Sequence, residues 1–310
     1  MAVTHGAATD RGEAVRRGRV RDRSWVRVSR GLYRPRLAEP ARTADLYGWQ
    51  SLLPVTGCFT HLTGALVRGW PVPPLPADLP VFAAICARDS RPRRPGLVIS
   101  RHPRPVEYDE IAGLRVARPA HILVGAARDL GLLDVLLLVD AALHRGECTL
   151  AELHQVAAHQ RGGPALRTAL RYADGRAESP WETVLRLLHQ VCDVPVEPQY
   201  GIGPFSADLR IVGTRRLAEY DGEVHRTADR HAKDLARERQ LHRLGWQRYG
   251  YTSRVILHNG LSVLRDADEA LGRPHEPERI RAWHRLLAES LFTPAGTARA
   301  RGRWAARPRA

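Results

Sequence analysis

The sequence is poor in lysine, methionine and aromatic residues. Of its 310 residues 48 are lysine or arginine, yet Lys233 is the single lysine, and aromatic residues make up only 6%. The arginine excess gives a formal net charge of +15, which favours a polyanionic partner. It does not establish one, because an arginine- and alanine-rich composition is also typical of GC-rich coding. With 44% hydrophobic residues the chain can form cores, which excludes wholesale disorder.

Long hydrophobic runs are also missing. The longest, residues 130–143, is too short to cross a bilayer and is interrupted by Asp134 and Asp140. The first residues, MAVTHGAATDR, lack the apolar segment of a signal peptide. No two cysteines form a CxxC pair, so we expect reduced thiols in a cytoplasmic protein. The four are Cys58, Cys86, Cys148 and Cys192.

The sequence pattern predicts an α/β protein with four zones. They are a basic module at 1–36, an α/β domain at 40–172, a second α/β domain at 176–292 and a flexible basic tail at 293–310. In the first zone we expect a helix at 11–21 and a β-hairpin within 21–35. A helix followed by a basic hairpin is typical of winged helix-turn-helix modules that bind DNA, here truncated. A solvated basic arm is the alternative. The arginines expected to contact DNA are Arg16, Arg17, Arg19, Arg27 and Arg30.

The second zone carries no catalytic motif. We expect helices at 58–67, 121–130, 132–144 and 149–159, the last with a capping box from Thr149 and Glu152, and strands at 81–87, 96–101 and 114–118. Cys58 and His61 have the spacing of half a metal site. Because no second pair exists, an ordinary core turn is favoured.

A capped helix opens the third zone. Ser179 suits the N-cap, Pro180 the first position, and the apolar residues that follow have helical spacing. Glu182 lies three residues after the cap. It either completes a capping box or reaches a metal site at the start of the helix.

Two strand-like runs around Gly213 and Thr214 predict a tight hairpin. Its register sets Asp208 opposite Glu219 and puts Asp221 on the same face. Like charges across a ladder are unfavourable unless a divalent cation neutralises them, and an all-oxygen ligand set favours Mg²⁺ or Mn²⁺. The alternative is a hairpin whose acids simply face water.

A basic helix follows these acids and ends at Gly245. His225 lies four residues after Asp221, close enough to join the acids. Five cations on this helix either bind a nucleic-acid backbone or form a solvated face. They are Arg226, Arg230, Lys233, Arg237 and Arg239.

The third zone resembles a known family. The ordered set comprises S-P-x-E at 179–182, Asp208, E-x-D-G-x-x-H at 219–225 and D-x-x-R-x-x-x-L-x-x-x-G-W at 234–246. Over residues 176–255 this resembles the relatives of very-short-patch-repair (Vsr) endonucleases, in the PD-(D/E)XK restriction-endonuclease-like superfamily. The upstream part, with RGLYRP, is similar in pattern to AbiEi-type antitoxins.

The resemblance implies a mixed sheet flanked by helices, with catalytic Mg²⁺ or Mn²⁺ bound by Asp208 and Glu219 and with Glu182 as the acid from the first helix. Asp221 stands where many superfamily members have lysine, so His225 is the candidate for activating water. Gly250 stands where family members often have arginine. Asp234 and Arg237 match a helix motif that an internal ion pair would explain.

Two functions follow as hypotheses. The first is a metal-dependent DNA endonuclease. The second is a DNA-binding regulator of the antitoxin type, in which the nuclease-like fold is only a scaffold. Both functions require DNA as a partner, and neither involves a membrane. A protein partner such as a toxin or a repair factor is compatible with both.

Overall fold

The computed structural model describes residues 15–18, 20–36, 42–222 and 228–306, without the side chains of 42, 43, 228–235 and 306. The chain forms two compact units. Unit 1 comprises residues 1–70, 75–126 and 302–310, and unit 2 comprises residues 71–74 and 127–301. The predicted domain boundary at 172–176 therefore lies inside unit 2. The reason is that helices from 132 onward share one hydrophobic core with the helix that starts at Pro180.

Unit 1 begins with a small antiparallel sheet, in the order β1-β3-β2. Its strands are β1 (Arg16–Arg17), β2 (Trp25–Ser29) and β3 (Leu32–Pro35). The hairpin expected within 21–35 is confirmed. The helix expected at 11–21 is wrong in its described part, because Arg16 and Arg17 pair with Tyr33 and Leu32 of β3.

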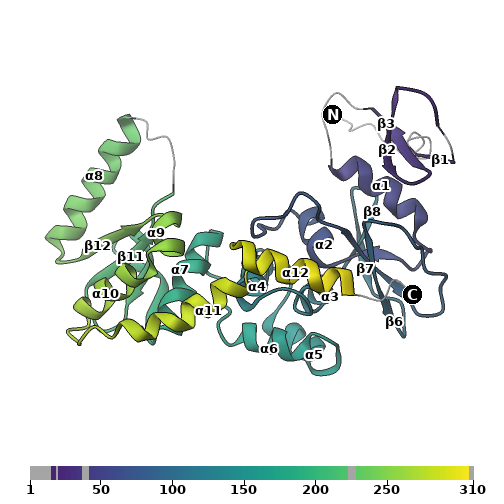
Figure 1. Cartoon of the computed structure of the whole chain (residues 1–310). Helices are drawn as coiled ribbons and strands as arrows, with labels where there is room; N and C mark the ends of the chain where they lie inside the picture. Colours follow the sequence, from purple (N-terminus) through teal and green to yellow (C-terminus); the bar gives the residue numbers. More distant parts are fainter. Residues whose placement is uncertain (1–14, 19, 37–41, 223–227, 307–310) are drawn as a thin grey trace. The chain divides into compact units, whose positions relative to one another are not determined.

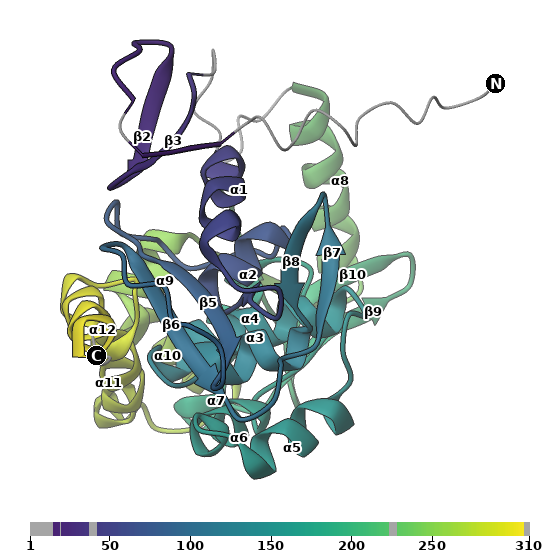
Figure 2. The same cartoon turned by 90° about the vertical axis from the view of Figure 1, so that its right-hand side faces the viewer.

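A second, five-stranded sheet completes the strands of unit 1, in the order β6-β5-β4-β8-β7. Its β5–β6 and β4–β8 pairs are parallel, and the other pairs are antiparallel. Helix α1 (Arg42–Leu52) lies between the two sheets of this unit (Figure 2), with Asp45 paired to Arg34 of β3 and Tyr47 bonded to the Ala112 carbonyl. The strands are β4 (Cys58–Phe59), β5 (Val81–Cys86), β6 (Leu97–His102), β7 (Tyr108–Ile111) and β8 (Leu114–Ala117).

The helices of unit 1 include α2 (His61–Val67) and α3 (Pro119–Ala126). The helix expected from residue 58 therefore starts three residues late, because Cys58 and Phe59 pair with β5 instead. The strands expected at 81–87, 96–101 and 114–118 are confirmed to within a residue or two. All four cysteines are free and buried, as expected, and burial raises the pKa of the Cys58 thiol to about 12.

Unit 2 opens with helices. They are α4 (Leu132–His144), α5 (Leu150–His159), α6 (Gly163–Leu170) and α7 (Pro180–Val191). The helices expected at 132–144 and 149–159 are confirmed, and Thr149 and Glu152 form the expected capping box. Ser179 caps α7 by accepting a hydrogen bond from the Glu182 N–H.

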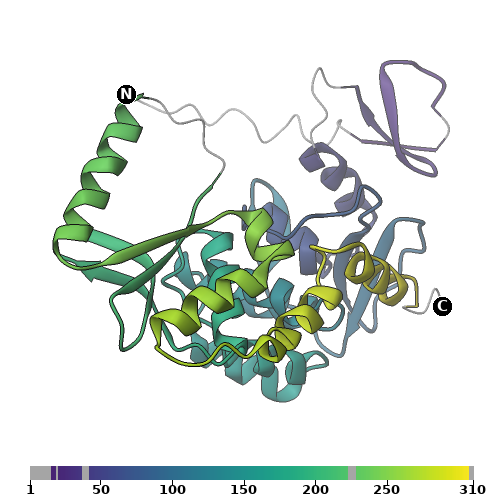
Figure 3. The same cartoon turned by 60° about the vertical axis from the view of Figure 1, so that its left-hand side comes forward.

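A four-stranded mixed sheet follows, in the order β12-β11-β10-β9. Helix α8 (Ala228–Arg243) covers one face, where Leu241 packs on Ala207 and Leu217. On the other face α7, α10 and α11 close a larger core around Trp283, and Figures 1 and 3 show α8 and α10 on opposite sides of the sheet. The strands are β9 (Val196–Ile202), β10 (Phe205–Ile211), β11 (Arg216–Tyr220) and β12 (Gln247–Tyr251), and the remaining helical segments are α9 (Ser253–His258), α10 (Gly260–Ala270), η1 (Pro277–Ile280), α11 (Arg281–Glu289) and α12 (Pro294–Ala306).

Two expectations for the C-terminal part have clear outcomes. Helix α8 ends as predicted, with Gly245 in a left-handed conformation (φ +78°) and the Trp246 N–H bonded to the Leu241 carbonyl. The flexible tail expected at 293–310 is wrong over 294–306, which form α12. Ala300 and Trp304, one helical turn apart, are both buried and make this segment a helix with an apolar stripe.

The chain is therefore an α/β protein with mixed and antiparallel sheets flanked by helices. Among the described residues, no helix has both the length and the apolar character needed to cross a membrane.

Candidate active site

The predicted hairpin between β10 and β11 has the expected register. Leu209 pairs with Ala218 and Arg210 with Leu217, which puts Asp208 opposite Glu219. The turn is longer than the two-residue loop of the prediction. It closes with a hydrogen bond from the Thr214 N–H to the Ile211 carbonyl, with Gly213 at φ +82°.

The transverse row that contains Asp208 and Glu219 continues onto the neighbouring strand on each side. On the β9 side, Ala207 pairs with Tyr200 and Leu209 with Pro198, so Asp208 lies opposite Gln199. On the β12 side, Glu219 pairs with Gly250 in the parallel ladder. Three neighbouring strands thus align Gln199, Asp208 and Glu219 in one transverse row.

Glu182 joins this row from the start of α7. Its side chain is buried, with 8% exposed, and its Oε2 accepts hydrogen bonds from the Glu178 N–H and from Gln199 Nε2, both at 2.9 Å. A capping box would need the carboxylate to accept from the N–H of Ser179 instead. Of the two interpretations open in the sequence, the capping box is therefore absent. Glu182 is turned toward the sheet.

Asp208 is the least compensated acid of the group. Its Oδ2 accepts one hydrogen bond, from the Tyr220 N–H at 2.8 Å. The pKa of Asp208 is raised to about 7, mainly by burial and also by the negative charges of Glu182 and Glu219, against the lowering effects of that bond and of Arg237. Near neutral pH this carboxyl group therefore gains or loses a proton readily.

Glu219, by contrast, is held by two arginines. Arg237 of α8 donates to both carboxylate oxygens, with its Nη2 2.7 Å from Oε1 and its Nη1 3.3 Å from Oε2. Arg248 of β12 donates through Nε to Oε2 at 2.5 Å and through Nη2 to Asp221. Asp221 therefore lies on the side of the sheet predicted for it, joined to Glu219 by a guanidinium group. Burial lowers the pKa of Arg248, but its bonds and charge interactions with these two acids outweigh that effect and raise it.

Gly250 makes room for this arrangement. A Cβ atom at this position would lie 1.8 Å from Oδ2 of Asp221 and would displace the carboxylate. The sequence comparison placed Gly250 where family members often have an arginine. The strand does have an arginine, Arg248, two residues earlier on the same side.

The fit of a divalent cation depends on which carboxylate oxygens have no hydrogen-bond donor. Within the described part of the chain, Oδ1 of Asp208 and Oε1 of Glu182 accept no hydrogen bond. Mg²⁺ commonly binds one or two protein carboxylates and completes its shell with water and substrate oxygens, so these two acids fit such an ion. No three His, Cys, Asp or Glu side chains among the described residues form a metal-binding group, and both oxygens of Glu219 are bonded to arginines.

Other predicted site residues have separate outcomes. His225, Arg226 and Arg19 lie outside the described residues, as do the side chains of Arg230 and Asp234. Arg237 pairs with Glu219, and the expected pair between Arg237 and Asp234 lies outside the described side chains. Arg16, Arg17, Arg27 and Arg30 lie exposed on the small sheet of unit 1, and Arg16 stacks over Trp25.

The sequence interpretation did not identify Gln199 or Arg248 as site residues. Gln199 could have been found by extending the hairpin register to the preceding segment. Arg248 could not be placed, because a parallel pairing across a helix leaves no turn from which to count residues.

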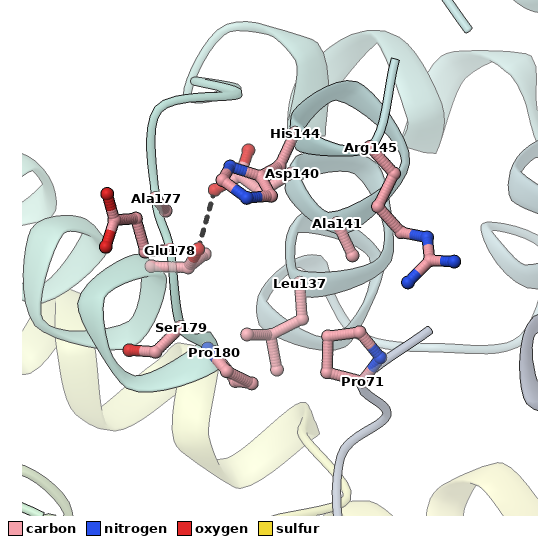
Figure 4. A pocket seen from close by; sticks show the side chains of 11 residues that line it. Pro71, Leu137, Asp140, Ala141, His144, Arg145, Ala177, Glu178, Ser179 and Pro180 are labelled. Carbon is pink, nitrogen blue, oxygen red and sulfur yellow. Dashed lines mark hydrogen bonds between the residues drawn. The ribbon is translucent and has the colours of Figure 1, made fainter. Parts of the chain in front are cut away.

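A cavity of about 150 Å³ lies beside the start of α7 (Figure 4). Glu182, Asp208 and Glu219 are not among the residues that line it. Asp140 and Thr183 line it and are bonded to each other, and Asp140 also pairs with the buried Arg186. The buried carboxylate of this cavity therefore already has its partners in the fold.

Comparison with known proteins gives two relatives of unassigned activity. The chain is 32% identical over 164 residues to two uncharacterized proteins of Mycobacterium tuberculosis, one from strain CDC 1551 / Oshkosh and one from strain H37Rv. The alignment covers 49% of this chain and 60% of each relative, so the chain spans less than two thirds of their length. No family model and no solved structure matches the chain.

Proposed function

We propose that unit 2 is a metal-dependent DNA endonuclease with a restriction-endonuclease-like, Vsr-like fold. The observation that carries this proposal is the meeting of Glu182, Asp208 and Glu219 from three separate elements, α7, β10 and β11. A buried acid whose pKa is raised by neighbouring acids, as that of Asp208 is, is costly to the fold, and such groups concentrate at functional sites.

The chemistry follows from the charges of the cluster. The cluster contains four carboxylates, those of Glu182, Asp208, Glu219 and Asp221, and two guanidinium groups, those of Arg237 and Arg248. The ionised cluster therefore keeps excess negative charge, which favours a cation. Glu182 and Asp208 would hold Mg²⁺ or Mn²⁺, which supplies activation of water and stabilisation of charge on a scissile phosphate.

The side chains around this position have distinct tasks. Asp208 would hold a cation as the ionised carboxylate, because the protonated form is a poor ligand. Arg237 and Arg248 are 30% and 26% exposed, so their guanidinium groups reach both the acids and an approaching phosphate. His225, by sequence position, is the candidate for moving a proton near neutral pH.

A plasmid-nicking assay tests the proposal, with purified protein in Mg²⁺, Mn²⁺ or EDTA. We expect nicking that needs the metal and that falls at least about a hundredfold in Asp208→Asn and Glu219→Gln, in line with the loss of a group that acts on the transition state. Glu238→Gln on the exposed side of α8 is the matched control and should retain activity. Cleavage that persists in EDTA or in Asp208→Asn would refute the proposed site.

The small sheet of unit 1 favours a second function, a DNA-binding regulator of the antitoxin type. Its exposed arginines make no ion pair with an acid among the described residues, so their charge is available to phosphates. This binding would not depend on Asp208, and a toxin or repair factor would be the protein partner. The exposed arginines are Arg16, Arg17, Arg21, Arg23, Arg27, Arg30 and Arg36.

Fluorescence anisotropy of labelled DNA at increasing salt separates the two functions. Replacing Arg27 and Arg30 by alanine should reduce the slope of log affinity against log salt by roughly one per lost phosphate contact. Arg281→Ala, which removes an exposed arginine already paired with Glu278, is the control. Salt-sensitive binding without any cleavage, on plasmid, single-stranded or mismatched DNA, would favour the regulator.

A further inference from the structure

Gln199 has a backbone conformation that its residue type seldom adopts. Its φ is +51°, in the left-handed region, inside strand β9 and directly opposite Asp208. Only glycine, and to a lesser degree asparagine and aspartate, adopt this region readily. Such strain is held in place by surrounding contacts and occurs often at functional sites.

The side chain of Gln199 is fixed at both ends. Its Nε2 donates to Oε2 of Glu182 at 2.9 Å, and its Oε1 accepts from the Ser206 hydroxyl at 2.8 Å. A carboxylate can only accept, so the amide nitrogen must face Glu182 and the amide oxygen must face Ser206. The orientation of the amide is therefore unambiguous.

These contacts also fix the orientation of Glu182. The Glu178 N–H and Gln199 Nε2 both donate to the same oxygen, Oε2, and leave Oε1 without a donor in the described part of the chain. Two donors on one oxygen prevent the carboxylate from turning about its terminal bond. The carboxylate held in this way is close enough to Asp208 for its charge to act on that side chain.

We infer that Gln199 is a positioning residue that holds the Glu182 carboxylate ready to bind a divalent cation together with Asp208. This inference rests on the proposed nuclease function. The left-handed backbone of Gln199 brings its amide to Glu182, and Ser206 keeps the amide in place. Groups that orient a ligand in this way typically account for a tenfold to hundredfold change in metal affinity.

The test measures Mn²⁺ binding to the full chain by electron paramagnetic resonance, and thermal unfolding in parallel. In Gln199→Gly the backbone is relieved of strain while the amide is lost. We expect Mn²⁺ affinity to fall about tenfold to a hundredfold, with an unfolding midpoint within a few degrees of that of the wild type. Ser206→Ala, which frees the amide but leaves it present, should weaken binding by a smaller factor.

Asp193→Gly is the matched control. Asp193 also has a positive φ, +57°, and an exposed side chain at the end of α7, so glycine relieves strain there without touching the site. Its Mn²⁺ affinity should equal that of the wild type. A tenfold loss in this control would show that backbone relief alone weakens binding, and would overturn the inference.

The outcomes distinguish this inference from the proposed function. Wild-type protein that binds no Mn²⁺ and nicks no DNA overturns both. Wild-type protein that binds Mn²⁺ and nicks DNA, with the affinity unchanged in Gln199→Gly, overturns only the role of Gln199. Loss of affinity in Gln199→Gly with a normal unfolding midpoint supports the positioning role, because a purely structural contact would lower stability instead.

Discussion

Unit 2 contains two kinds of buried aspartate, which differ in how their charge is compensated. Asp140 has 2% of its surface exposed and is bonded to Arg186, to the Thr183 hydroxyl and to the Asp174 N–H. Asp208 has one N–H donor and two acids as neighbours. Burial raises the pKa of both, to about 6 for Asp140 and about 7 for Asp208.

This difference in charge compensation distinguishes an acid that stabilises the fold from an acid that can bind a ligand. The partners of Asp140 are all fixed by the fold and join α4 to α7, so its carboxylate has no capacity left for a ligand. Asp268 is similar, with Arg273, His275 and Arg279 around a side chain that is 1% exposed. Among the described residues, Oδ1 of Asp208 has no hydrogen-bond donor, and the positive charge of Arg237 compensates the buried carboxylate only in part.

The largest expected effect on stability is at Asp140, whose charge the fold compensates. Asp140→Asn removes one charge of the buried pair and leaves the Arg186 guanidinium unpaired, so the free energy of unfolding should fall by about 3–5 kcal/mol. Urea denaturation at pH 7 measures this. Glu278→Gln, at an exposed ion pair, is the control and should change little. An Asp140→Asn protein as stable as the wild type would show that this pair is not structural.

At Asp208, the less compensated of the two acids, the expected change in stability has the opposite sign. Because the pKa of Asp208 is raised from 3.8 to about 7, the folded state holds a proton that the unfolded state has lost, and stability falls as pH rises through this window. Asp208→Asn removes that loss. At pH 8 it should stabilise the fold by about 1–3 kcal/mol, less than the full shift implies, because the group is partly exposed.

The pH profile of this variant sharpens the test. The gain should be complete above pH 7 and vanish below about pH 4, where the wild-type carboxyl group is protonated in both states. Thermal unfolding of the wild type and Asp208→Asn from pH 4 to 8 measures it. A variant that is less stable than the wild type at pH 8 would place Asp208 with Asp140 as a structural acid.

The smallest effect concerns cation affinity. With the pKa of Asp208 near 7, roughly a tenth of the side chains are ionised at pH 6 and nine tenths at pH 8, so Mn²⁺ should bind about tenfold more tightly at pH 8. Calorimetric titration at the two pH values measures this ratio. In Asp208→Asn the ratio should approach one, and a tenfold ratio that survives in that variant would assign the proton to another group.

The sequence predicted the parts of this site that depend on local spacing. The N-cap at Ser179 and the register that sets Asp208 opposite Glu219 follow from short-range rules, and both are confirmed. The helix expected at 11–21 fails for the opposite reason. Its arginines suit a helix in isolation, but Arg16 and Arg17 add to the hairpin edge, and tertiary pairing outweighs local propensity.

The parts that could not be predicted depend on long-range pairing. Arg237 and Arg248 approach Glu219 from α8 and β12, and their approach requires a parallel strand and a crossover helix to be placed first. The strain at Gln199 has no signature in composition. The α/β class was predictable from the pattern of elements, whereas the finer restriction-endonuclease-like fold is a proposal.

The space above Gly250 has a consequence for how this chain can vary. A methyl group there would expel the Asp221 carboxylate from its place beside Arg248, while the backbone itself would not be strained. Tolerance at position 250 should therefore depend on the size of residue 221. In a library that randomises both positions, alanine at 250 should be recovered mainly with serine or glycine at 221. The residues allowed at the two positions would therefore covary.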